Sequence, residues 1–433
     1  MPSPALSVAS IVRPQNSAFA GQSPAPAYQS FPVQGALESA SSLRAASLQY
    51  RYRQTDEERL REELSRAETL SGIDCSKTFD ILYKLGGVLM AQGRYKSAEE
   101  VIRRLVEGLQ AVHGNDCIET LDAFELLGEV LICQGLYHRA EKLHRRIFNA
   151  RKGMLGDEHL STLRSKASLA LTYRNQGRWK EAEELFIKVI EIEKRVFGEE
   201  HPNTLTRTGN LALTYWDQGR WKEAEELFIQ LVDTEKRVLG DEHPSTLRSK
   251  ANMALTYKSQ GRWKEAEELS IQVVETEKRV LGDEHPNTLS SKANLALTYK
   301  NQGRWKEAEE LFMQVVETRK RVLGDEHHGT LTSKANLAST YWDQRRWKEA
   351  EELFVQVVEA FERVLGEEHP NTLASKANLA FIFKHQGKIN KAISLMQDCY
   401  TLRAKVLGPQ HPYTISSHEN LTAWKLEDTK LSE

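Results

Sequence analysis

The chain has 433 residues, of which 28% are charged and 40% are hydrophobic, and its formal net charge is -2. This length exceeds what one compact core usually holds, so it predicts several domains or an elongated array. The near-zero net charge argues against a dedicated nucleic-acid or membrane-surface protein, and no run of 18 apolar residues is present to cross a bilayer. The four cysteines are scattered and include no CxxC pair, which favours reduced thiols in a cytoplasmic protein.

Residues 1–54 are rich in Ser, Ala, Pro and Gln and poor in large apolar side chains. Such a segment cannot bury enough surface to offset its ordering entropy, so we expect a disordered tail. Thr55 and Glu58 then have the spacing of a capping box, and the residues that follow predict a helix over 56–70. We therefore expect an N-terminal capping helix within 55–72.

A period of 42 residues governs the rest of the chain. The glycine of a Gln-Gly turn recurs in steps of 42 from Gly93 to Gly387, with Arg345 in place of one copy, and a second glycine series runs from Gly72 to Gly408 with the same step. Self-similarity of this length indicates stacked supersecondary units. We expect the array to occupy 73–428 and a short C-terminal tail to occupy 429–433.

Each unit divides into two helical segments. In one copy, residues 203–219 carry apolar residues at helical spacing, with Asn203 expected as the N-cap after Pro202 and Gly219 as the stop. The second segment, 220–240, begins with a tryptophan and predicts a helix of about 20 residues, roughly 30 Å long. The unit is therefore a helical hairpin, and the chain is predicted to be an all-α solenoid of about eight hairpins with terminal capping helices.

Several side chains of the repeated block QGRWKEAEELF have expected structural roles. We expect the turn tryptophans to wedge between helices in the core, and Lys222 and Glu226 to pair on a solvated flank. Arg345 in a left-handed turn would be strained by about 1 kcal/mol. Ser270, where other copies have phenylalanine, predicts a thin spot in the core.

The pattern Leu211-Ala212, Tyr215, Gly219, Ala224 and Phe228 resembles the tetratricopeptide repeat, and the 42-residue period with the link LGDEHPNTL is similar to the kinesin light chain-like variety. Near-identical copies of this kind also resemble the repeat arrays of fungal and bacterial nucleotide-binding sensor proteins. The resemblance spans 56–426 and implies a right-handed superhelix whose concave groove, lined by first helices, holds peptides or partner proteins. Two departures stand out: 1–54 show no heptads, and GKIN at 387–390 departs from a phosphate-binding loop.

The links between units carry a recurring acid-acid-His pattern, from His159 to His411. Each histidine stands one repeat from the next, without the short spacing that brings two ligands onto one helix. No nucleophile stands beside a paired base in the sequence, and HExxH is absent. We expect no enzyme, no catalytic residue, no cofactor and no metal site.

Asparagine recurs on the first helices, at Asn210, Asn252, Asn294, Asn336 and Asn378, with Asn420 in the last one and Ser168 in an earlier one. A buried packing position would not keep choosing an amide, because an unpaired amide is costly to bury. The resemblance implies that these amides bond the backbone of a bound extended peptide. The alternative is that they bond a neighbouring helix.

Two positions near each asparagine vary while their surroundings repeat. Six residues after it stand Arg174, Trp216, Lys258, Lys300, Trp342 and Lys384, and four residues before it stand residues that include Arg164 and Arg248. We expect a basic groove with two exposed aromatic residues, suited to an acidic peptide with an aromatic or apolar anchor. The alternative is solvated surface with sequence drift.

Together these features predict a non-catalytic adaptor that binds proteins or peptides in the groove, and neither nucleic acid, a membrane nor a small-molecule substrate. Two alternatives stay open: a sensor segment related to nucleotide-binding immune-type proteins, and a structural array that self-associates through its ends or convex face. The oligomeric state is open as well.

Overall fold

The structure, a computed structural model, describes residues 53–71 and 76–432, and within them every regular element is an α-helix. The tail expected over 1–54 lies outside these residues, apart from the start of the first helix. The helices are α4 (Arg53–Ser71), α5 (Ser76–Ala91), α6 (Tyr95–His113), α7 (Ile118–Cys133), α8 (Tyr137–Leu155), α9 (Leu160–Asn175), α10 (Trp179–Phe197), α11 (Pro202–Asp217), α12 (Trp221–Leu239), α13 (Pro244–Ser259), α14 (Trp263–Val280), α15 (Pro286–Asn301), α16 (Trp305–Leu323), α17 (His328–Asp343), α18 (Trp347–Val364), α19 (Pro370–His385), α20 (Ile389–Val406) and α21 (Pro412–Ser432).

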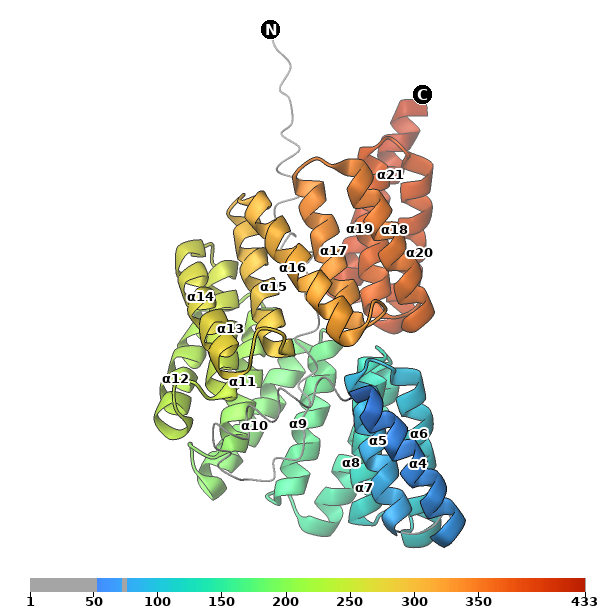
Figure 1. Cartoon of the computed structure of the whole chain (residues 1–433), viewed down its shortest axis with the longest axis vertical. Coiled ribbons are helices and arrows are strands. Elements are labelled where there is room, and N and C mark those ends of the chain that lie inside the picture. The colour runs from blue at the N-terminus through green and yellow to red at the C-terminus, as the bar shows by residue number, and fades with distance from the viewer. Residues whose placement is uncertain (1–52, 72–75, 433) are drawn as a thin grey trace.

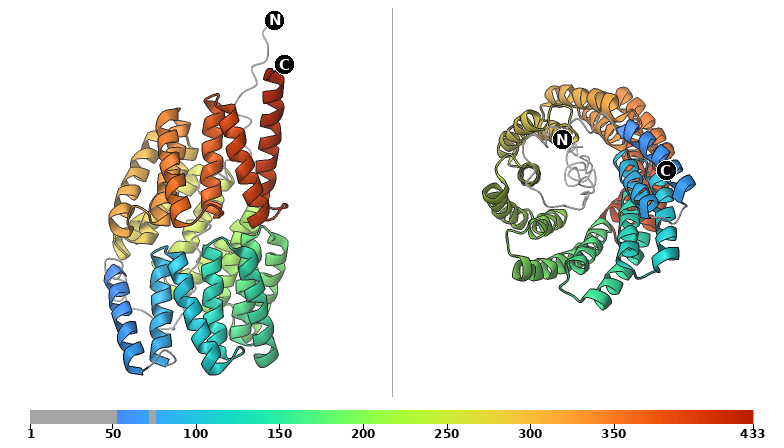
Figure 2. Two further views of the ribbon diagram at one scale, coloured as in Figure 1. Left: turned by 90° about the vertical axis from the view of Figure 1, so that its right-hand side faces the viewer. Right: turned by 60° about the horizontal axis from the view of Figure 1, so that its bottom comes forward.

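From α5 to α20 the helices form antiparallel hairpins that stack in chain order (Figure 1). The stack coils as a right-handed superhelix, so that its last hairpins rise over its first ones (Figure 2). First helices such as α11 and α13 lie on the inner side of the coil, and their partners α12 and α14 lie outside (Figure 1). The all-α superhelical solenoid predicted from the sequence is confirmed.

The two ends differ from the expected boundaries. Helix α4 begins at Arg53, so Thr55 lies inside the helix and does not precede it as an N-cap. Helix α21 continues to Ser432, through most of the segment 429–433 that was expected to be a tail. It is held in place because Leu421 and Trp424 are buried against α20.

The histidine of each link begins the following first helix. In α11 the N-cap is His201, whose Nδ1 accepts a hydrogen bond from the backbone N–H of Asn203 at 3.3 Å. The expected N-cap Asn203 is therefore wrong: Pro202 occupies the first helical position, and the imidazole two residues earlier satisfies the free N–H. The same bond recurs at the other links.

The Gln-Gly turns require a left-handed residue. Gly219 has φ of 76° and Gly303 has φ of 78°, a region in which a side chain is strained. Arg345 keeps this conformation with φ of 63°, so the condition under which the sequence predicted strain is met, at a cost of about 1 kcal/mol.

The charged side chains of the repeated block clamp neighbouring hairpins together. The guanidinium of Arg220 bonds Glu223 at 2.5 Å in its own helix and Glu183 of the preceding repeat at 2.7 Å, and it also covers the Tyr215 ring at 4.1 Å. Equivalent clamps recur at Arg262, Arg304 and Arg346. The described residues contain no ion pair between Lys222 and Glu226, so the expected solvated pair is wrong.

The core between helices is made by alanine and phenylalanine, not by the turn tryptophans. Ala224 and Phe228 are fully buried, whereas Trp263 and Trp305 are 43% and 41% exposed. The expected wedge is therefore wrong, because a side chain at the first position of a helix stands at the edge of the stack. Ser270 is buried where other copies hold phenylalanine.

Successive turns of the superhelix also contact each other. The links at His327, His369 and His411 pack on the Gln-Gly turns of the first three hairpins, 234 to 236 residues earlier in the chain. Tyr137 is buried in the same region, in a cluster with Val406 and Leu407. We call this contact the seam.

Candidate protein-binding face

The asparagine series lies along the first helices, with one amide on each of five successive hairpins. Asn210 and Asn336 are buried, at 4% and 7% exposure, while Asn252, Asn294 and Asn378 are partly exposed. The two buried amides belong to the helices that also carry Trp216 and Trp342. The expectation that this position is not buried is therefore wrong for two of its five members.

Most of these amides are unused by the fold. Within residues 53–71 and 76–432, the side chains of Asn210, Asn294, Asn336 and Asn378 form no hydrogen bond. In α21 the equivalent Asn420 instead donates to the backbone oxygen of Ser416 at 2.7 Å. A partly buried amide without a partner is a ready donor and acceptor for a peptide backbone.

The varied residues six positions later are engaged with the next repeat. Arg174 bonds Asp217 at 2.5 Å, and Lys384 bonds Glu427 at 2.5 Å. Lys300 bonds Ser339 at 2.6 Å and stands 3.3 Å from Asp343. Three of the four cations in this series therefore have carboxylate partners, which corrects the expected basic groove.

The two tryptophans follow the same rule of pairing with the next first helix. The indole Nε1–H of Trp216 donates to the Ser259 hydroxyl at 2.9 Å. Trp342 lies edge-on to His385, with ring centroids 5.2 Å apart, and also contacts Trp347. Both rings are half-buried, so the prediction of exposed aromatic anchors is wrong.

Lys258 differs from its counterparts. It lies half-buried on α13, and within the described part of the chain its ammonium has no carboxylate or hydrogen-bond partner. Burial, together with the nearby charge of Lys300, lowers the pKa of Lys258 to about 8. An unpaired cation among paired ones is a place where a carboxylate from outside would be favoured.

The partners in these pairs were not identified from the sequence as functional residues. They stand 43 positions after the varied residue: Asp217, Ser259, Asp343, His385 and Glu427. The sequence did contain a signal for these pairs. Each acidic residue stands 43 positions after a lysine or arginine, and Ser259 stands 43 positions after Trp216. Much of the variation inside the monotonous repeat therefore records contacts between neighbouring hairpins.

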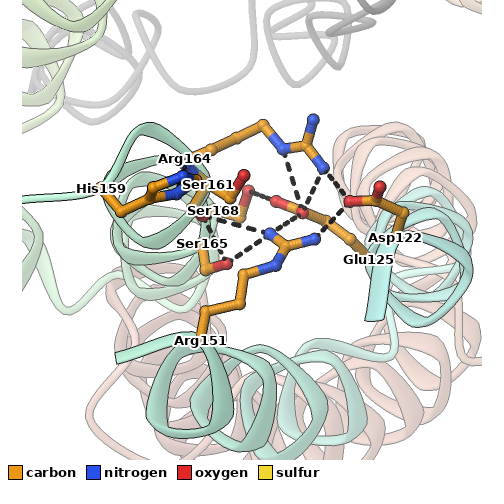
Figure 3. A network of polar contacts seen from close by, with 8 residues as sticks. All are labelled: Asp122, Glu125, Arg151, His159, Ser161, Arg164, Ser165 and Ser168. Carbon is orange, nitrogen blue, oxygen red and sulfur yellow. Dashed lines mark hydrogen bonds and ion pairs between the residues drawn. The ribbon is translucent and has the colours of Figure 1, made fainter. Parts of the chain in front are cut away.

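Arg164 of α9 belongs to a network that joins the second and third hairpins (Figure 3). It bonds Asp122 at 2.5 Å and Glu125 at 3.0 Å, and the fully buried Arg151 bonds the same two carboxylates at 2.5 Å each. Burial alone would raise the pKa of Glu125, but the two guanidinium groups hold it below its ordinary value. Ser168, at the asparagine position, donates to Glu125 at 2.9 Å. Arg248, by contrast, is exposed.

The position of Arg151 in the second helix carries a buried charge in other repeats too. Glu193, Glu235 and Glu277 occupy it in α10, α12 and α14, and all three are nearly inaccessible. Burial raises the pKa of each carboxyl group, and that of Glu277 reaches about 7. Within the described chain, each of the three has at least one carboxylate oxygen without a hydrogen-bond partner.

The link histidines are structural, and no group of His, Cys, Asp or Glu in the described segments is arranged to hold a metal ion. Their Nδ1 atoms are used as N-caps, and in the seam Nε2 of His369 stands 3.0 Å from the Cys133 carbonyl oxygen. None of the described helices is long and apolar enough to cross a bilayer.

The pairs and clamps that join each hairpin to the next repeat with the 42-residue period of the sequence. Residues 77–153, 158–234, 208–275, 248–321, 292–363 and 330–405 match the family model described as tetratricopeptide repeat. The chain belongs to the tetratricopeptide-repeat family. Its repeats are of the kinesin light chain-like type.

Two solved structures are similar to parts of the chain. A putative kinesin light chain with nearly identical TPR-like repeats from Podosopora anserina is 38% identical over 48% of this chain and 98% of that one, with a TM-score of 0.40. BtubC (BKLC) from P. vanneervenii is 19% identical over 53% of this chain and 92% of that one, with a TM-score of 0.44. No curated protein matches the chain.

Proposed function

We propose that this protein is a non-catalytic scaffold that binds extended peptide segments of partner proteins along the inner face of its first helices. The observation that carries the proposal is the row of amides at Asn210, Asn294, Asn336 and Asn378, which the fold leaves without partners. Amides spaced one repeat apart suit an extended backbone, which offers N–H and C=O groups at regular intervals.

The asparagine row explains affinity for a backbone but not selectivity. We infer that Lys258 favours a peptide with an acidic side chain near the middle of the row, because it is the member of its series without a carboxylate partner in the described chain. The half-buried rings of Trp216 and Trp342 flank this place along the array. The part of each ring that stays accessible supports an apolar or aromatic anchor beside the acid.

Nucleic acid is a weaker fit to this face. Binding to a phosphate backbone uses a stripe of available lysine and arginine side chains, and here Arg174, Lys300 and Lys384 are already paired with carboxylates. The free thiols of Cys117, Cys133 and Cys399 support the cytoplasm as the place of action.

A pull-down with the full chain tests the scaffold function. We expect wild-type protein and Asn420→Leu to recover the same partners from a lysate of the source cell, because Asn420 is already bonded within its own helix. Asn294→Leu/Asn378→Leu should lose them. If the double variant keeps every partner, the amide row is not the binding site.

Lys258→Gln, compared with Lys300→Gln, tests the inferred selectivity. Removal of the unpaired cation should weaken a partner with an acidic segment more than removal of the paired one. Equal effects would show that the acid does not lie at Lys258.

A further inference from the structure

The seam is an interface between two kinds of edge that every repeat possesses. One edge is formed by the Gln-Gly turns and the other by the histidine links. At Gly135 a Cβ atom would lie 2.3 Å from Pro370, and at Gly177 it would lie 2.8 Å from the His411 ring, so the link sits directly on the turn glycine. The aromatic residue after the turn takes part, because the Tyr95 hydroxyl stands 3.3 Å from Nδ1 of His328.

The first three turns are covered in this way, but the following turns are not. At Gly219, Gly261 and Gly303 no atom of the described chain lies within 4 Å of where a Cβ would be. The tryptophans after two of these turns, Trp263 and Trp305, are among the most exposed large hydrophobic side chains of the molecule. Among the residues that the structure describes, no link packs on these turns. We call the turns at these three glycines, with their tryptophans, the open turn edge.

A hollow of about 510 Å³ lies on this open turn edge. Its lining consists of Gly303, Arg304, Trp305, Lys306, Glu307 and Gln344. The hollow occupies the place at which, one superhelical turn earlier, a link rests on its turn.

The matching half of the interface is also open elsewhere on the molecule. His159 is exposed, and the links at His201 and His243 are only partly covered. We call these three links the open link edge. They carry the same capping histidine bond as the links in the seam.

Both open edges contain sequences that also occur in the seam, where they form the contact between link and turn. The open turn 301–305 reads NQGRW, identical to the covered turn 175–179. The open link 201–204 reads HPNT, identical to 369–372 in the seam. Turn and link sequences that contact each other in the seam therefore also occur, without that contact, at the two open edges.

We propose that the open turn edge binds the open link edge of a second copy of this chain. The contact is heterologous, so the copies add head to tail along the superhelix axis. The partner is inferred from the seam, where the same kinds of link and turn already contact each other. A link of the second copy would place its proline on the turn glycine, as Pro370 does at Gly135. Its histidine Nε2 would face the turn carbonyl, as His369 does at Cys133. The exposed indoles lose water-accessible surface in the contact.

The N-terminal helix α4 is a poor surface for this association. The exposed residues of α4 include Glu58, Arg59, Arg61, Glu62 and Arg66, which is the polar outer face of a capping helix. End-to-end stacking of hairpins through α4 would therefore bury charges. The proposed association uses the two rims of the coil and not the α4 end.

Sedimentation velocity of the full chain over a range of concentrations tests the proposal. We expect the wild type to shift from 49.3 kDa to larger species as the concentration rises. Trp263→Glu/Trp305→Glu should remain monomeric, and so should Pro202→Arg/Pro244→Arg, with circular dichroism showing that both keep their helix content. The control Ile229→Glu/Met313→Glu changes exposed apolar residues on second helices away from both rims, and it should associate like the wild type.

Mixing the two monomeric variants distinguishes a heterologous contact from nonspecific association. The tryptophan variant keeps its link edge and the proline variant keeps its turn edge, so the mixture should form a one-to-one dimer that does not grow. The proposal is overturned if the wild type stays at 49.3 kDa at every concentration, or if the mixture forms no dimer. It is also overturned if both edge variants associate as strongly as the control.

Discussion

One position of the second helix holds Arg151 in α8 and Glu277 in α14, and the two repeats bury this charge differently. Arg151 is surrounded by Asp122, Glu125 and the Ser165 hydroxyl, all within hydrogen-bond distance (Figure 3). Glu277 has Ser291 beside it but keeps one unpaired oxygen, and its pKa rises to about 7.

The difference separates a diverged region of the array from a nearly uniform one. The second hairpin contributes Asp122 and Glu125 and the third contributes Arg164, and together these charges compensate one another and the buried guanidinium of Arg151. The middle hairpins are near copies, and among the described residues Glu277 has no ion-pair partner, whereas the equivalent Glu193 lies 3.8 Å from Arg207. The buried charge of Glu277 is therefore less well compensated than that of Arg151.

Leucine at the two equivalent positions gives the largest expected contrast. Arg151→Leu should destabilise the protein by about 3–5 kcal/mol, because it leaves the buried carboxylate of Glu125 and the partly exposed one of Asp122 with one guanidinium instead of two. Glu277→Leu should be neutral or stabilising by about 1–4 kcal/mol, because an incompletely paired buried charge is replaced by an apolar group. Urea unfolding monitored by circular dichroism measures both. Loss of stability of the same size in both variants would contradict the comparison.

The two kinds of buried group also give opposite dependence on pH. The pKa of His369 is lowered to about 4 by burial, against an ordinary 6.5, so protonation of the unfolded chain weakens the seam as pH falls from about 6.5 to 4. Glu277 has its pKa raised from 4.5 to about 7, so the middle repeats lose stability as pH rises through this interval. Each effect has an upper limit of about 3 kcal/mol.

Hydrogen exchange at pH 5 and pH 8, corrected for intrinsic rates, resolves the two regions. We expect faster opening of α19 at pH 5 and faster opening of α14 at pH 8. Glu277→Gln should remove the second effect and leave the first. A uniform response along the array would contradict the assignment of these groups.

Ser270→Phe tests a smaller difference among the near copies. Phe228 and Phe312 are fully buried at the same position, so the new ring should fill a site built for it and stabilise the protein by about 1–3 kcal/mol. The melting temperature should rise. A fall would show that the neighbouring helices have closed around the serine.

The sequence predicted the fold well because its strongest signals are local and repeated. The 42-residue period, the left-handed glycines and the apolar spacing specify hairpins one by one, and stacking follows from their uncovered faces.

The binding face was less predictable because its side chains are shared between repeats. Lys300 reads as a free cation in its own helix, and only the stack shows Asp343 beside it. The seam was not predicted at all, since a contact 236 residues apart depends on the pitch of the superhelix. The pitch results from the sum of small rotations between successive hairpins, so it cannot be predicted from the sequence of a single repeat.

The central claim is that the unpaired asparagines bind a peptide backbone, and affinity for selected peptides tests it most directly. Peptides chosen from a random library on the full wild-type chain would be labelled, and binding would be followed by fluorescence anisotropy. We expect Asn294→Leu/Asn378→Leu to weaken binding at least about tenfold, which corresponds to about 1.4 kcal/mol, and Asn420→Leu to leave it unchanged. Unchanged affinity in the double variant would contradict the claim.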